Sequence, residues 1–184
     1  MTDVRAALLQ QIKDKAVVHG KVTLSSGLEA DYYVDLRRIT LDGEAAPLVG
    51  QVLLDLTAEL DFDAVGGLTM GADPVACAAL AGGADVKAFF IRKETKAHGL
   101  QRRVEGPPLD PDDRCLIVED VVTTGGSTLQ AIEAVREGGH QIAGVVTILD
   151  RLAGGAERIR EAANGAPYEP LATIDDVYPD RPDR

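Results

Sequence analysis

The sequence predicts an α/β fold in which helices cover both faces of a central, mostly parallel sheet. Segments of continuous apolar character alternate with segments of helical spacing between residues 63 and 174. The apolar segments lack the polar alternation of half-exposed strands, and strands of this kind are buried on both faces, as in parallel sheets. At 184 residues the chain is long enough for one domain with a sizeable core.

Five apolar segments are expected to form strands: residues 63–68, 86–92, 114–120, 142–151 and 168–174. Between or after them, helices are expected over residues 73–82, 126–139 and 154–165. Asp73 should cap the first of these helices, and Pro74 should occupy its first helical position.

The N-terminal part of the chain has a different sequence pattern from the alternating strands and helices that follow it. Residues 3–16 place Leu8, Leu9, Ile12 and Ala16 at helical spacing, which predicts an amphipathic helix. Residues 20–38 have glycine punctuation and β-forming residues, and they predict a hairpin or short strands. A helix should follow over residues 44–60, and residues 178–184 look like a frayed tail.

Composition narrows the possible partners. The net charge of −11 argues against nucleic acid or an anionic membrane as the main partner. The chain has no apolar run long enough to span a bilayer and no signal-type apolar block near its start, so we expect a cytoplasmic protein. Cys77 and Cys115 lie in apolar surroundings and should be small buried hydrophobes rather than disulfide or metal ligands.

The stretch CLIVEDVVTTGGST (115–128) carries the first functional signal. A buried strand delivers Glu119 and Asp120 to the carboxyl end of the sheet, where ligands of parallel sheets bind. The glycines, hydroxyls and helix start that follow suit a phosphate dianion, and the carboxylates suit ribose hydroxyls. The sequence has neither a Walker A loop nor a dinucleotide fingerprint. The plainer alternative is a strand, turn and helix with a solvated acidic corner.

The second signal is a basic cluster. Residues 92–103 hold five Lys and Arg side chains against one carboxylate, Glu94. They belong to a segment of low apolar content, residues 92–111, between two expected strands, and long segments of this kind tend to be lids or binding loops. A basic one is a candidate clamp for an anionic ligand, and the alternative is a solvated basic turn.

These motifs carry a family resemblance. CLIVEDVVTTGGST resembles the phosphoribosyl pyrophosphate (PRPP) motif of type I phosphoribosyltransferases. Three further segments make the chain similar to orotate phosphoribosyltransferases: VTLSSGLEADYYVDLR (22–37), VGGLTMGADPVA (65–76) and RKETKAHG (92–99). The resemblance runs from about residue 17 to residue 151, and the 92–99 segment is its most specific part.

The resemblance implies a Rossmann-like type I phosphoribosyltransferase fold as a single domain, 1–184. Residues 1–40 would contribute a small hood, and residues 92–111 would form a mobile catalytic loop. It implies transfer of ribose 5-phosphate from PRPP to orotate, which gives orotidine 5′-monophosphate and pyrophosphate in pyrimidine biosynthesis. Mg²⁺ would be the cofactor, held mainly through PRPP and water rather than by direct protein ligands. The chain would form a homodimer with shared active sites.

Roles for single residues follow from the same resemblance. Lys96, His98 and Asp120 match catalytic positions, with Lys96 the main one. Thr123, Arg151, Tyr33 and Val34 match orotate-binding positions. The PRPP-binding positions are Arg92, Lys93, Lys96, His98, Glu119, Asp120, Val121, Val122, Thr123, Thr124, Gly125, Gly126 and Ser127.

Further expectations concern backbone geometry and departures from the family. A non-proline cis peptide is expected within residues 69–73. Many members have lysine where this chain has Ser25, and some have one in place of Gly71, so more of the pyrophosphate binding should fall to residues 92–98. The competing functions are a type I phosphoribosyltransferase for a purine or uracil, and a non-catalytic regulator that senses PRPP.

Overall fold

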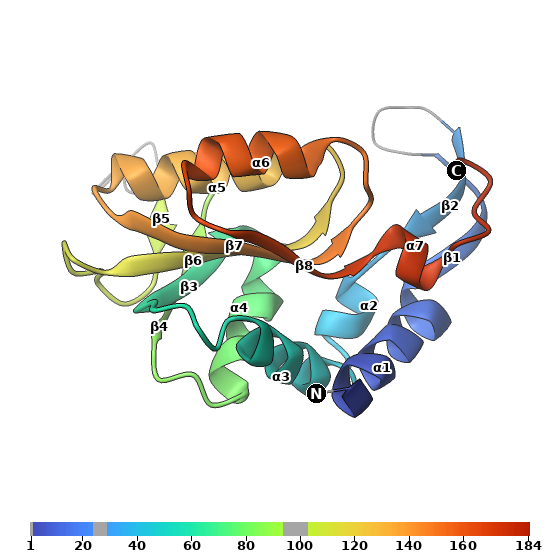
Figure 1. Cartoon of the computed structure of the whole chain (residues 1–184), viewed down its shortest axis with the longest axis horizontal. Coiled ribbons are helices and arrows are strands. Elements are labelled where there is room, and N and C mark those ends of the chain that lie inside the picture. Colours follow the sequence, from blue (N-terminus) through green and yellow to red (C-terminus); the bar gives the residue numbers. More distant parts are fainter. Residues whose placement is uncertain (1, 24–28, 94–102) are drawn as a thin grey trace.

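The computed structural model describes residues 2–23, 29–93 and 103–184, and a six-stranded sheet forms the centre of the molecule (Figure 1). The strand order is β5-β4-β3-β6-β7-β8, and neighbouring strands are parallel except for the antiparallel pair of β4 and β5. The strands are β3 (Ala64–Leu68), β4 (Lys87–Ile91), β5 (Val104–Glu105), β6 (Arg114–Val122), β7 (Gln141–Asp150) and β8 (Tyr168–Thr173). The predicted α/β class and mostly parallel sheet are confirmed.

Helices cover both faces of the sheet. Helices α5 (Gly126–Glu137) and α6 (Gly155–Ala163) lie on one face, and α3 (Ala46–Leu56) and α4 (Ala72–Ala81) lie on the other (Figure 1). Successive residues of β6 enter opposite cores: Leu116 packs on the α3–α4 side, and Ile117 on the α5–α6 side. This two-sided burial explains why the strands read as continuous apolar runs.

A small antiparallel hairpin lies beyond one end of the sheet (Figure 1). The chain reaches it through α1 (Thr2–Gln11) and a π-helical turn, η1 (Ile12–Ala16). Strands β1 (Val17–Thr23) and β2 (Glu29–Val34) form the hairpin, with Val17 opposite Val34. The predicted helix and hairpin are therefore confirmed, and the short helix α2 (Arg37–Thr40) follows them.

Three predictions about α4 are wrong: Asp73 is not its cap, Pro74 is its third residue rather than its first, and Cys77 is not buried. Gly71, not Asp73, is the residue before the helix, so Asp73 lies in its first turn, where its carboxylate accepts a hydrogen bond from Thr69 Oγ1 at 2.8 Å. A carboxylate there still complements the positive end of the helix dipole. Cys77 is exposed, whereas Cys115 is buried as expected. Because α4 is apolar on nearly every side, its sequence did not reveal which face points outward.

The predicted frayed tail is also wrong. Helix α7 (Ile174–Val177) follows β8, and a capping box between Thr173 and Asp176 defines its start. Beyond it, Arg181 pairs with Asp175 and brings the last residues back toward the hairpin (Figure 1). Within the described ranges, no helix has the length and apolar character needed to cross a membrane.

Candidate functional site

The order of the strands defines the position of the site. From β3 the chain proceeds to β4 on one side, and from β6 it proceeds to β7 on the other. Ligands of open parallel sheets bind beyond the carboxyl ends of the strands at such a switch point. Two loops emerge there, the turn at residues 69–71 and the loop at residues 123–125. The bond between Thr69 and Met70 is a non-proline cis peptide, as predicted for this turn.

The loop after β6 encloses a cavity of about 330 Å³, which we call the phosphate cavity. Gly125 has a φ of +79°, a left-handed conformation that favours glycine, and α5 starts directly after it. The helix therefore directs its first N–H groups toward the cavity, an arrangement suited to a phosphate. The lining residues are Glu119, Val121, Thr123, Thr124, Gly125, Gly126, Ser127, Thr128 and Gln130.

Two buried polar atoms beside this cavity have no hydrogen-bond partner within the described ranges. They are Oε2 of Glu119 and Oγ1 of Thr128, whose residues are 4% and 1% exposed. Native proteins rarely leave such groups unsatisfied, because each unmet bond costs about 1–3 kcal/mol. Both residues line the phosphate cavity, so these unmet bonds lie beside it. Thr128 was not among the predicted site residues, although it directly follows the predicted loop.

Charge is concentrated at the same place. Burial, followed by the neighbouring charge of Asp120, raises the pKa of the Glu119 carboxyl well above its usual range, whereas the charge of Lys93 lowers it. Glu119 therefore tends to hold a proton when no ligand is bound. Asp120 is less buried, and its Oδ1 accepts a hydrogen bond from the backbone N–H of Val121 at 2.7 Å.

The turn after β3 packs directly on Asp120. A Cβ atom at Gly71 would lie 2.5 Å from Oδ1 of Asp120, so only glycine leaves this carboxylate in its present position. From α2, Arg37 forms an ion pair with Asp35 at 2.8 Å, which raises the pKa of Arg37, and the charge of Asp120 adds to this effect. The sequence analysis did not single out Arg37.

Helix α6 contacts the loop at residues 123–125, which we call the phosphate loop. The backbone N–H of Gly155 donates to the carbonyl of Thr123 at 3.1 Å, and Arg158 Nη1 donates to the carbonyl of Thr124 at 2.6 Å. A Cβ at Gly155 would approach the Thr123 carbonyl to 2.6 Å. Sequence reasoning missed this support, because nothing in the spacing connects α6 to a loop about thirty residues earlier.

The predicted orotate-binding residues come from three elements. Arg151 directly follows β7, and its backbone N–H donates to the carbonyl of Val122 at 2.9 Å. This bond holds Arg151 beside the start of the phosphate loop and beside Thr123. Tyr33 and Val34 end β2, where Tyr33 is exposed and the Val34 side chain is buried in the core. Val34 can therefore contact a ligand only through its backbone.

The basic segment is described only at its two ends. Arg92 and Lys93 are exposed, and Arg92 forms an ion pair with Glu105 at 3.6 Å. The backbone N–H of Arg92 donates to the carbonyl of Arg103, so the segment leaves and rejoins the sheet edge at one point. Lys96 and His98, two of the three predicted catalytic residues, lie outside the described residues.

Val121 and Val122, which were predicted to bind PRPP, lie in different surroundings. Val121 lines the phosphate cavity, whereas the Val122 side chain is 1% exposed and packs against the α5–α6 side of the sheet. In the described part of the chain, no group of three or more His, Cys, Asp or Glu side chains is placed to hold a metal ion.

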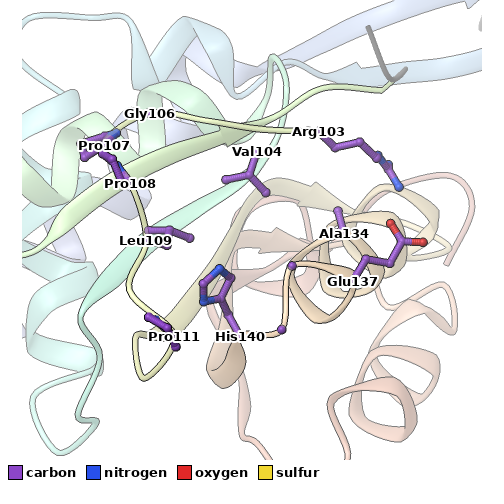
Figure 2. Close-up of a pocket in the computed structure, with 12 residues that line it drawn as sticks. Arg103, Val104, Gly106, Pro107, Pro108, Leu109, Pro111, Ala134, Glu137 and His140 are labelled. Carbon is purple, nitrogen blue, oxygen red and sulfur yellow. The ribbon is translucent and has the colours of Figure 1, made fainter. Parts of the chain in front are cut away.

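A larger cavity of about 600 Å³ lies elsewhere and shares no residue with the phosphate cavity (Figure 2). Its lining includes Arg103, Pro111 and His140. Pro111 lies shortly before β6, and His140 lies directly before β7. Prolines 107, 108 and 111 form much of its wall, opposite the C-terminal turn of α5. Because it lies away from the carboxyl ends of the strands, we assign the chemistry to the smaller cavity.

Comparisons with known proteins show the family of the chain. The family model described as "Phosphoribosyl transferase domain" matches residues 40–166. A Streptomyces avermitilis protein named orotate phosphoribosyltransferase is 73% identical over 172 residues, which cover 91% of this chain and 93% of that protein. The chain belongs to the orotate phosphoribosyltransferase family.

Other members of the orotate phosphoribosyltransferase family extend the match. A Corynebacterium glutamicum orotate phosphoribosyltransferase is 53% identical over 176 residues, covering 95% of this chain and 94% of that protein. The crystal structure of the Mycobacterium tuberculosis enzyme in complex with PRPP has a TM-score of 0.81 and 42% identity, and the match covers 95% of this chain and 98% of that one. The match therefore includes the hairpin and the sheet.

Proposed function

We propose that the chain transfers the ribose 5-phosphate group of PRPP to orotate, giving orotidine 5′-monophosphate and pyrophosphate. The observation that carries this proposal is the cavity at the carboxyl end of β6, where a glycine-rich loop and a helix start lie beside Glu119. Family membership is consistent with it. The proposed roles of the residues follow.

At the phosphate end, residues 123–127 surround the 5′-phosphate with backbone N–H groups and hydroxyls, and the start of α5 adds its dipole. Glu119 and Asp120 accept hydrogen bonds from the ribose hydroxyls. Displacement at the anomeric carbon places positive charge on the ribose ring. Asp120, which is the more accessible carboxylate, lies where it can stabilise that charge.

At the pyrophosphate end, negative charge grows on the leaving group. Arg92 and Lys93 begin the basic segment at the edge of the sheet. Although burial and the charge of Asp120 raise the pKa of Glu119 more strongly, the charge of Lys93 lowers it. We propose that Lys96 and His98 complete the cationic set that grips pyrophosphate. Closure of this segment would also exclude water, which competes with orotate for PRPP.

Mg²⁺ belongs to the proposal as a cofactor bound mainly by the phosphate oxygens of PRPP and by water. Oxygen ligands of this kind match its preference. When bound, it neutralises charge on the leaving pyrophosphate. The partly exposed Asp120 carboxylate would accept a hydrogen bond from a water bound to the ion.

A homodimer with shared active sites completes the proposal. Cys77 and Leu80 are exposed on α4, and their spacing of three residues places them on one side of it. Met70 is exposed in the turn just before the helix. Such a surface is suited to a second copy of the chain, which would contribute Lys96 and His98 to its partner's site.

The direct test is to mix the purified protein with orotate, PRPP and Mg²⁺ and to follow the loss of orotate absorbance. Orotate consumption that depends on PRPP is expected, with adenine, guanine, hypoxanthine and uracil as poor substrates. Preferential use of another base would assign the chain a different specificity. Binding of PRPP without turnover of any base would favour a PRPP sensor.

Sharing of sites has a separate test. Inactive Lys96→Ala protein is mixed with inactive Asp120→Ala protein under conditions of subunit exchange. Hybrid dimers would hold one intact site, so part of the activity should return. No recovery despite demonstrated exchange would mean that each chain completes its own site.

A further inference from the structure

The predicted base-binding arginine is held by residues that the sequence analysis did not single out. Nη2 of Arg151 donates to the hydroxyl oxygen of Tyr32 at 2.7 Å, and its guanidinium carbon lies 5.0 Å from the centre of the Tyr32 ring. The same hydroxyl lies 3.0 and 3.1 Å from the two carboxylate oxygens of Asp183, to which it donates its proton. Tyr32 thus connects the last residues to the arginine.

Asp183 is itself anchored from the other side. Nε of Arg181 lies 3.3 Å from Oδ1 of Asp183, and Arg181 also pairs with Asp175 of α7. The Tyr178 ring packs edge-on against Tyr32, with 5.2 Å between ring centres. The segment after α7 is therefore fixed by several contacts to the ring and hydroxyl that contact Arg151.

This arrangement restrains the arginine and neutralises its charge only in part. Asp183 shares its charge with Arg181 and lies 3.5 Å from Nη2 of Arg151, with the Tyr32 hydroxyl as the closer contact. Within the described ranges, Nε and Nη1 of Arg151 have no hydrogen-bond partner. Paired hydrogen bonds to a carboxylate use Nη2 together with either Nε or Nη1. Because Nη2 carries two N–H groups, it can donate one to Tyr32 and keep the other for such a pair.

We propose that Tyr32 and Asp183 are positioning residues that fix Arg151 for the carboxylate of the pyrimidine base and thereby set the preference for orotate over uracil. This inference rests on the proposed function. A free arginine side chain loses considerable rotamer freedom when a ligand immobilises it. Holding it in place beforehand removes that cost, but only for a ligand whose carboxylate contacts it.

The test compares two nucleotides that differ only in that carboxylate. Orotidine 5′-monophosphate and uridine 5′-monophosphate share the ribose, the phosphate and the pyrimidine ring, so their affinities, measured by titration calorimetry, isolate the contribution of the carboxylate. Tyr32→Phe keeps the ring but removes the hydroxyl. It should weaken binding of orotidine 5′-monophosphate about 10- to 100-fold, as expected for loss of a hydrogen bond to a charged group, and binding of uridine 5′-monophosphate less than twofold.

Further variants separate positioning from folding. Asp183→Ala changes an exposed side chain and should act in the same direction, with no added loss when combined with Tyr32→Phe, because both act through Arg151. Tyr178→Phe preserves the ring contact with Tyr32 and is the matched control, with affinities like those of the wild type. Neither Tyr32→Phe nor Asp183→Ala should weaken either nucleotide further in an Arg151→Ala background.

The outcomes are decisive in both directions. Equal weakening of the two nucleotides by Tyr32→Phe would indicate a merely structural role, and no weakening of either would show that Arg151 needs no positioning. Both results would overturn the inference while leaving orotate turnover by the wild type intact. A wild-type protein that turns over another base instead of orotate would overturn the proposed function itself.

Discussion

Replacing Gly71 by alanine tests whether Asp120 must keep its present position. A Cβ atom at Gly71 would lie 2.5 Å from Oδ1 of Asp120 and 2.8 Å from its Cγ. Because comfortable contacts between such atoms are about 3.5 Å, the carboxylate would have to retreat by roughly 1 Å. The backbone of Gly71 is helical, with φ −65° and ψ −42°, so alanine fits the backbone and the perturbation falls on Asp120.

A retreat of this size breaks the proposed hydrogen bond from a ribose hydroxyl to Asp120. Hydrogen bonds to charged groups contribute about 1.5–3 kcal/mol, so kcat/KM for PRPP should fall about 10- to 100-fold. Initial rates of orotate consumption at varied PRPP measure this fall. The midpoint of thermal unfolding should change little, since rotation of one partly exposed side chain relieves the clash.

Two controls make this prediction specific. Gly43→Ala adds the same methyl group where no atom lies within 4 Å, and it should leave the kinetics unchanged. In an Asp120→Ala background, where the carboxylate is absent, Gly71→Ala should not weaken PRPP binding further. Wild-type kinetics for Gly71→Ala, or an equal loss of PRPP affinity in both backgrounds, would refute the reasoning.

Three other substitutions test the remaining parts of the site. Lys96→Ala should leave folding intact and lower kcat by about 10²–10⁴-fold, and an unchanged kcat would remove Lys96 from the mechanism. Arg151→Ala should raise the KM for orotate roughly 10- to 100-fold with little change for PRPP, and a loss confined to PRPP would contradict that role. The pKa of Glu119 is raised, so the folded state holds its proton more tightly, and stability should fall as pH rises from 4.5 toward about 9. Glu119→Gln should remove up to about 1.4 kcal/mol per pH unit of that slope, and thermal melts of the ligand-free protein with identical slopes for both proteins would count against it.

The sequence was most informative where one physical pattern had one structural meaning. The runs at residues 63–68 and 114–120 could only be strands buried on both faces, and β3 and β6 lie there. The glycines and hydroxyls after residue 122 could be assigned to a phosphate loop because strand, loop and helix follow one another directly along the chain.

Contacts between distant segments left no such pattern. Gly71 contacts Asp120 across two neighbouring strands, and nothing in the spacing of these residues predicts the approach. Residues 178–184 contain prolines and charges typical of a frayed tail, yet Arg181 and Asp183 find partners on α7 and β2. Pairing of this kind depends on tertiary geometry, which local propensity does not encode.

A chain with a net charge of −11 repels anionic substrates, and the two ends of the site overcome this repulsion in different ways. Within the described ranges, the residues that line the phosphate cavity include no Lys or Arg, so the 5′-phosphate would be held by backbone N–H groups, hydroxyls and the helix dipole. In the proposed reaction, the pyrophosphate end would rely on exposed cations such as Arg92 and Lys93. Fixed dipoles would hold the part of PRPP that stays in the product, whereas cations would stabilise the charge that develops on the departing group. This division explains why a chain with so many carboxylates can concentrate its basic residues in one segment and still bind a highly charged substrate.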